Sequence, residues 1–176
     1  MFLRQIEPPE NEPITLDEAK LHLKIDIDDD NELIEALITA SRQAVEKYLR
    51  RSIMPQTWEL VTDYDNGVVL PYPPVLEIVS VATNGHLIDP DKYHLIGENY
   101  LKISSFLYRN LVITYQAGYE EVPGGIKLGI LMLIAHLYEN RAGEPAEVKY
   151  NAQVLAGVGL PPTIISILYP YRVVSF

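Results

Sequence analysis

The hydrophobic repeat of this chain changes period twice, and that change limits its possible folds more than any other feature. Between residues 31 and 50 the apolar residues recur three and four positions apart, which is the repeat of an α-helix. Between residues 56 and 119 the repeat shortens to two, as in β-strands, and an apolar helical run returns after residue 126. The sequence therefore predicts an α+β fold, mainly α, in which a small antiparallel β insertion interrupts a helical bundle.

Three main helices are expected in the bundle. Thr15 followed by Glu18 forms a capping-box pattern, which predicts a short helix from about residue 16 to residue 24. The second helix spans residues 31–50 and has acidic residues at its start and basic residues at its end, as the helix dipole favours. The third, residues 126–140, is apolar nearly all round, which is typical of a helix buried at the centre of a bundle.

The strand block contains several short segments with a period of two. Asn84-Gly85 is a typical hairpin turn, and the proline-rich stretch 70–74 cannot form regular structure. The predicted strands are residues 57–61, 75–81, 86–88, 93–96, 100–103 and 111–115. Tyrosines lie in or beside these segments, and they fit either a half-covered interface or ordinary sheet packing.

The chain ends in an apolar, nearly uncharged segment. Thirteen of the 23 residues from 154 to 176 are Val, Leu, Ile, Tyr or Phe, and Arg172 is the one ionised side chain among them. Such a surface is seldom left open to water, so it must be covered by the chain itself or by a neighbouring subunit. We expect a bundle core of residues 1–55 and 120–142, an inserted sheet of residues 56–119, and an extended C-terminal arm, 143–176, with a short terminal helix.

Composition limits the functional classes. The chain has no cysteine, so it has no disulfides or thiolate metal sites, and its longest apolar run, residues 126–137, is too short to cross a membrane. The net charge is −10, and residues 1–60 contribute −6 of it, with 7 Lys or Arg against 13 Asp or Glu. This balance argues against gripping nucleic acid. It suits either a wall past which DNA slides or simple solubility.

No arrangement of residues predicts catalysis, a cofactor or a metal. Asp26, Asp28 and Asp30 alternate as in calcium loops, but the loop glycine and the distal glutamate are missing, and capping explains these acids without a metal. The four histidines show no metal-ligand spacing, and no serine lies in a nucleophile elbow. We therefore do not expect an enzyme.

A succession of short motifs, in order along nearly the whole chain, carries a family resemblance. The motifs are residues 13–24 (PITLDEAKLHLK) before the acidic loop, 44–51 (AVEKYLRR), 56–58 (QTW), 70–75 (LPYPPV), 115–119 (YQAGY), Pro123 with the helix through 136–141 (HLYENR), and 168–172 (LYPYR). This order resembles the head–tail connector family of long-tailed bacteriophages and prophages, also called adaptor or head-completion proteins.

The resemblance implies a structural subunit that is not an enzyme. It implies a ring of about twelve copies on the portal protein, which extends the DNA channel and offers a docking surface to stopper or tail proteins. It further implies that DNA passes through the ring without sequence-specific binding and that no membrane is involved. The implied location is the virion neck at the portal vertex, after assembly in the host cytoplasm. The C-terminal arm of such proteins commonly reaches the portal.

Two sets of residues are candidates for these contacts. The acids expected near the channel are Asp26, Asp28, Asp29, Asp30, Glu32 and Glu35. The residues expected to contact the portal or another subunit are Ile164, Ile165, Leu168, Tyr169, Tyr171 and Arg172. Three alternatives remain: a tail-completion or stopper protein, a DNA-packaging accessory protein, and a small enzyme whose site residues are dispersed in the sequence.

Overall fold

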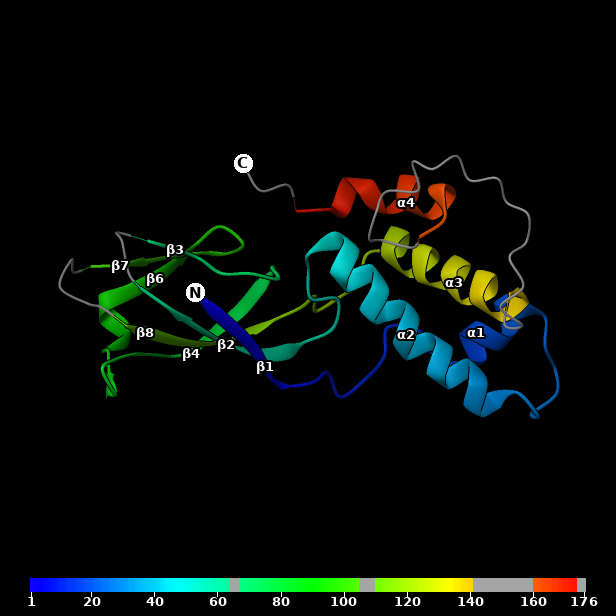
Figure 1. Cartoon of the computed structure of the whole chain (residues 1–176), viewed down its shortest axis with the longest axis horizontal. Helices are drawn as coiled ribbons and strands as arrows, with labels where there is room; N and C mark the ends of the chain where they lie inside the picture. The colour runs from blue at the N-terminus through cyan, green and yellow to red at the C-terminus, as the bar shows by residue number, and fades with distance from the viewer. Residues whose placement is uncertain (64–66, 105–109, 141–159, 174–176) are drawn as a thin grey trace. The chain divides into compact units, whose positions relative to one another are not determined.

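The computed structural model describes residues 1–63, 67–104, 110–140 and 160–173. The chain divides into two compact units (Figure 1). The first, here called the sheet unit, comprises residues 1–11 and 50–121. The second, here called the helical unit, comprises residues 12–49 and 122–176. Each unit has its own buried residues, and each is considered separately below.

The helical unit contains α1 (Leu16–Leu23), α2 (Asn31–Leu49), α3 (Gly124–Glu139) and α4 (Pro162–Leu168), followed by the 3₁₀ turn η2 (Tyr169–Tyr171). The predicted capping box is present. The Thr15 hydroxyl accepts a hydrogen bond from the Glu18 backbone N–H at 3.2 Å, and the Glu18 carboxylate accepts one from the Thr15 N–H at 2.8 Å. Helix α3 packs against α1, α2 and α4, which explains why its sequence is apolar nearly all round.

The sheet unit consists of two antiparallel sheets. Its strands are β1 (Phe2–Glu7), β2 (Gln56–Thr62), β3 (Val68–Val69), β4 (Val75–Thr83), β5 (His86–Leu87), β6 (Tyr93–Ile96), β7 (Tyr100–Ile103) and β8 (Leu111–Ala117), with a 3₁₀ turn η1 (Pro90–Lys92). The larger sheet has the order β1-β2-β8-β4-β5, and the smaller has the order β3-β7-β6. Asn84 and Gly85 form the predicted hairpin turn between β4 and β5, both with positive φ.

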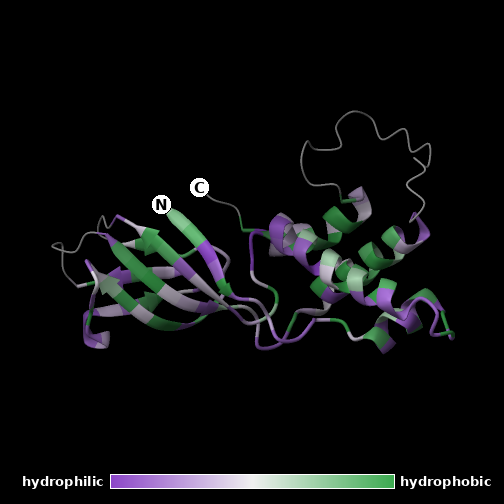
Figure 2. Cartoon of the chain, turned by 60° about the horizontal axis from the view of Figure 1, so that its bottom comes forward, coloured by the Kyte–Doolittle hydropathy of each residue, from purple (hydrophilic) through white to green (hydrophobic). Residues whose placement is uncertain are grey.

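Alternation along the strands places one core between the two sheets. In β8, buried and half-buried residues alternate strictly, and Figure 2 shows the same alternation of hydrophobic and hydrophilic residues along strands of this unit. The buried side chains of β8, such as Ile113, meet Leu60 and Val81 from the larger sheet and Leu101 from the smaller. The other face of the larger sheet therefore points away from this core.

The prediction of a mainly α fold is wrong. Of the described residues, 38% are helical and 29% are in strands, so the fold is a mixed α+β fold. Two features caused the error. Residues 2–7 form an edge strand of six residues that pairs with β2, and the strand block forms two sheets around a core of its own. Such long-range pairing leaves little trace in the local repeat.

The C-terminal part of the chain is described in part. The prediction of an extended arm falls mainly on residues 141–159, which lie outside the described residues. The short terminal helix predicted within this arm is present as α4, Pro162–Leu168.

Candidate assembly surfaces

The acids expected near a DNA channel occupy the α1–α2 loop and the first turns of α2. Asp26, Asp28, Asp29, Glu32 and Glu35 are exposed, and Asp30 is half-buried. The segment therefore presents a dense negative surface on the helical unit.

Two of these acids also have structural contacts. The Asp28 carboxylate accepts hydrogen bonds from Lys20 Nζ at 2.6 Å and from Asn31 Nδ2 at 3.2 Å. The hydrogen bond from Lys20, followed by that from Asn31, lowers the pKa of Asp28 below its ordinary value. Asp30 accepts a hydrogen bond from the hydroxyl of Tyr138 on α3. These contacts tie the acidic loop to α1 and α3, and they hold the charged surface in a fixed place.

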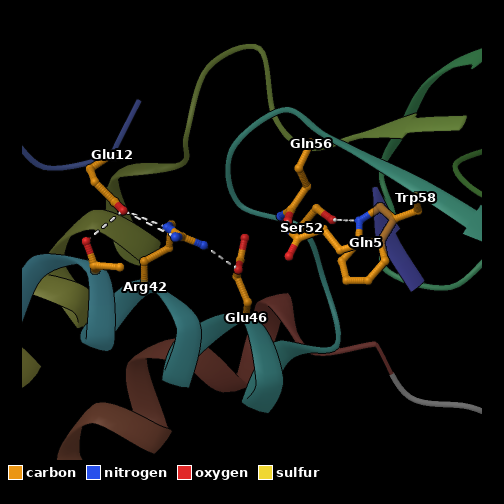
Figure 3. A network of polar contacts seen from close by, with 8 residues as sticks. Gln5, Glu12, Arg42, Glu46, Ser52, Gln56 and Trp58 are labelled. Carbon is orange, nitrogen blue, oxygen red and sulfur yellow. Dashed lines mark hydrogen bonds and ion pairs between the residues drawn. The ribbon is translucent and has the colours of Figure 1, made fainter. Parts of the chain in front are cut away.

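A buried ion network lies further along α2 (Figure 3). Arg42, only 5% exposed, donates from Nε to Glu12 Oε2 at 2.7 Å and from Nη2 to Glu12 Oε1 at 3.2 Å. Its Nη1 donates to Glu46 Oε2 at 2.8 Å, and the Thr39 hydroxyl donates to Glu12 at 3.0 Å. Glu12 is the first residue of the helical unit, so this network fixes the point where the chain leaves β1 and enters the helices.

The surroundings of Arg42 stabilise its charged form. Burial by itself would lower the pKa of the guanidinium, but the hydrogen bonds and charges of Glu12 and Glu46 outweigh burial and raise that pKa. The sequence alone did not reveal this network. Arg42 and Glu46 have the helical i, i+4 spacing of an ion pair, which is a usable signal, whereas Glu12 is 30 positions from Arg42 and gave none.

The C-terminal residues expected at a portal or subunit contact lie against the chain's own helices. Ile164 and Leu168 are buried where α4 packs on α3. Gly129 makes this packing possible, because a Cβ there would lie 2.6 Å from Leu168 Cδ2. Gly125, one turn earlier, gives the same room to Tyr171, whose hydroxyl oxygen would lie 2.5 Å from an added Cβ.

The end of this segment is fixed on α2. The Arg172 guanidinium lies over the Tyr48 ring, 5.1 Å from its centroid, and the Val173 N–H donates to the Leu49 carbonyl at 2.9 Å. Among the six predicted contact residues, Tyr169 is the exposed one, at 60%. The structure therefore holds the segment on α2 and α3 and leaves Tyr169 open to solvent, with Ile165 half-buried.

Comparisons with known proteins identify the family of this chain. The family model of head completion proteins matches residues 12–174, which is most of the chain. The chain belongs to the head completion protein family. A comparison with curated proteins gives no match.

Solved structures of phage-like particles share the fold of this family member. A chain in the neck of an empty gene transfer agent particle with C6 symmetry aligns with a TM-score of 0.75 at 13% identity, over 100% of this chain and 97% of that one. A chain in the virion of a native gene transfer agent aligns with a TM-score of 0.74 at 14% identity, with the same coverage. A chain in the neck of a native particle with C12 symmetry gives 0.72 at 14% identity, again over 100% and 97%.

The described part of this head completion protein holds no candidate metal site. No group of three or more His, Asp or Glu side chains in it could bind a metal ion. No helix in the same residues is long and apolar enough to span a membrane.

Proposed function

We propose that the chain is a head–tail connector, or adaptor, subunit that forms an oligomeric ring beneath the portal in the virion neck. The ring would extend the DNA channel and provide the surface on which stopper or tail proteins dock. The observation that carries the proposal is the match to the head completion family over residues 12–174. The likeness of the whole fold to chains from gene transfer agent necks with C6 and C12 symmetry supports a place in a ring.

The test is deletion of the gene in a strain that produces the particles. We expect heads that package DNA but lack tails, and restoration of tails when the gene is supplied again. Electron cryomicroscopy of the restored necks should show a ring of about twelve copies directly below the portal. A ring found in a lower layer would instead favour the stopper or tail-completion role, and salt-dependent binding of DNA would favour a packaging accessory.

Within such a ring, the acidic surface of the α1–α2 region is proposed to face the channel. The exposed acids Asp26, Asp29, Glu32 and Glu35 would repel DNA phosphates and keep the duplex from adhering to the wall. Asp28 and Asp30 hold the loop in place through Lys20 and Tyr138.

Charge removal tests this role. We expect Asn or Gln at these four exposed positions to slow DNA ejection from purified particles, most strongly at low salt, where electrostatic interactions reach furthest. A matched control removes four exposed carboxylates of the sheet unit, Asp89, Asp91, Glu120 and Glu121, and should leave ejection unchanged. Equal ejection rates in both variants and the wild type would remove the acids from the channel wall.

The C-terminal segment is proposed to contact the portal or a neighbouring subunit. Tyr169 and Ile165 are available for this contact with α4 in place, whereas Ile164 and Leu168 could join it only if α4 left α3. Tyr171 and Arg172 would keep the segment on the helical unit. Tyr169→Ala should then reduce incorporation of the protein into particles without lowering the stability of the free chain, because the side chain is mostly in water before assembly.

A further inference from the structure

The outward face of the larger sheet carries an apolar row that crosses all five strands. The strand register places Phe2 beside Val61, Val61 beside Val112, Val112 beside Ala82, and Ala82 beside Leu87. Paired residues of neighbouring antiparallel strands point to the same face, so the five side chains form one continuous row. At the two ends of the row the side chains are largely in water, and Leu87 is 77% exposed.

This row faces away from the core. The residues one position along each strand, Leu60, Val81 and Ile113, are fully buried between the two sheets. Since side chains alternate across a strand, the row containing Val61 and Val112 must lie on the opposite side.

The smaller sheet carries a second apolar row on its own outward face. Tyr100 in the central strand β7 pairs with Val69 on one side and with Ile96 on the other. Val69 and Ile96 are exposed, the latter by 46%, and the neighbouring residue Leu101 is buried in the core. The sandwich thus has an apolar row on each of its two opposite faces.

The polar residues beside the two rows differ in charge. Among the described residues of the larger sheet, Glu7, Glu59 and Glu77 share the outward face with one cation, Arg4, which pairs with Glu59 at 2.7 Å. On the smaller sheet Lys102 pairs in register with His94 beside the apolar row, and both side chains are exposed. The first face is therefore acidic around its apolar row, and the second carries a cation, Lys102, beside its row.

We propose that these two faces are the two halves of the contact between neighbouring copies in the ring. The larger-sheet face of one copy stacks on the smaller-sheet face of the next copy, with apolar row against apolar row and the glutamates near Lys102 and His94. The inference rests on the proposed ring function and names the surfaces that build it. A ring needs two unlike, complementary surfaces on each subunit, and here one sandwich supplies both.

Charge argues against the alternatives. The sheet unit has 6 Lys or Arg against 11 Asp or Glu, giving −5, and the helical unit has 8 against 13, also giving −5. Both units are therefore net negative, so a favourable charge contact between two copies needs a local cationic surface, which Lys102 supplies. Stacking either face on its own kind would oppose glutamates to glutamates or lysine to lysine, whereas stacking unlike faces joins opposite charges.

The dimensions permit such a ring. Packed sheets lie about 10 Å apart, so each copy would add about 20 Å, half within the sandwich and half between sandwiches. Twelve copies would then close at a radius of about 40 Å. The smaller sheet limits the contact, because its three strands are two to four residues long. With strands about 4.8 Å apart its face covers roughly 200 Å², so side chains beyond these strands must supply most of the roughly 800 Å² that each partner buries in a stable contact.

Cross-linking can test the contact because the chain has no cysteine of its own. The variant Val112→Cys/Ile96→Cys places one thiol on each outward face. Sheets about 10 Å apart keep these two thiols from joining within a chain. In assembled particles, a short bifunctional thiol reagent should convert this variant into a ladder of oligomers. Each single variant, Val112→Cys or Ile96→Cys, should give only chains that are not cross-linked.

The outcomes separate the inference from the proposed function. If electron cryomicroscopy shows the ring in place but the double variant gives no ladder, the inference is overturned and the function stands. Dimers from either single variant would mean that like faces meet, which also overturns it. Absence of the wild-type protein from particle necks would instead refute the proposed function itself.

Charge variants provide an independent measurement. Lys102→Glu should reduce incorporation of the protein into particles at least tenfold, because it places a carboxylate against the acidic face. Lys24→Glu makes the same charge change at an exposed site in the helical unit and should incorporate normally. Equal incorporation of the two variants would overturn the assignment of the smaller-sheet face.

Discussion

Replacement of Arg42 by methionine is the sharpest test of how the helical unit is held together. The side chains of Arg42 and Glu46 are 6% and 11% exposed, and that of Glu12 is 28% exposed. The variant removes the cation that both carboxylates contact in a setting with little water. Removing one partner of a buried ion pair costs about 3–5 kcal/mol. Because Glu12 can regain part of its hydration, we expect Arg42→Met to lower the free energy of unfolding by about 3 kcal/mol.

The position of the single tryptophan provides an internal control. Trp58 lies in the sheet unit, where it stacks on Tyr72 and donates to the Ser52 hydroxyl at 2.9 Å. In a urea titration, far-UV circular dichroism follows the helices, whereas tryptophan fluorescence follows the sheet unit. Arg42→Met should therefore shift the dichroism midpoint more than the fluorescence midpoint.

A second variant distinguishes the buried charges from a simple loss of packing. In Glu12→Gln/Arg42→Met/Glu46→Gln the two carboxylates are gone, so most of the lost stability should return. The reasoning is refuted if Arg42→Met costs less than about 1 kcal/mol, or if the triple variant is no more stable than the single one.

Four further predictions concern local contacts. Thr15→Ala removes the cap of α1 and should cost about 1 kcal/mol in chemical denaturation, whereas Thr15→Ser should cost little. The backbone hydrogen bond at Thr15 lowers the pKa of the Glu18 carboxyl in the folded chain. The stabilisation by the Glu18 carboxylate is therefore complete above its unfolded pKa of about 4.3, and it is lost as the pH falls through the lower folded pKa. Glu18→Gln should flatten stability against pH in that acid range, and an unchanged profile would contradict this role. Leu168→Ala should lower the free energy of unfolding by about 2–5 kcal/mol and make the C-terminal segment the first part of the helical unit that a protease cleaves. If this variant resists the protease as well as the wild type does, Leu168 does not hold α4 in place. Gly118→Ala should destabilise the sheet unit, seen by Trp58 fluorescence, because Gly118 has a φ of +148° and an added Cβ would lie 2.4 Å from the Met54 carbonyl carbon.

Local rules predicted those elements whose cause is local. The capping box at Thr15, the amphipathic repeat of α2 and the Asn84-Gly85 turn each depend on residues within a few positions of one another. Strands β6 and β7 also came directly from their repeat.

Features that depend on distant residues could not be predicted in the same way. Strand β1 is mostly exposed, so it has little apolar alternation, and it is held by pairing with β2 some fifty positions later. The Glu12–Arg42 contact and the seating of Leu168 over Gly129 likewise join residues that no sequence spacing connects. Nor could the two apolar rows be seen, because each exists only once the strand register is known.

The structure changes how the apolar C-terminal segment is interpreted. Its composition required a cover, either from the chain itself or from a neighbour. Helix α3 is apolar nearly all round, and α4 packs on it. For residues 160–173, therefore, the helix and the tail cover each other, and the tail's hydrophobicity alone no longer argues for a partner. The argument for assembly rests instead on the family match and on the opposed faces of the sheet unit, where apolar rows remain in water.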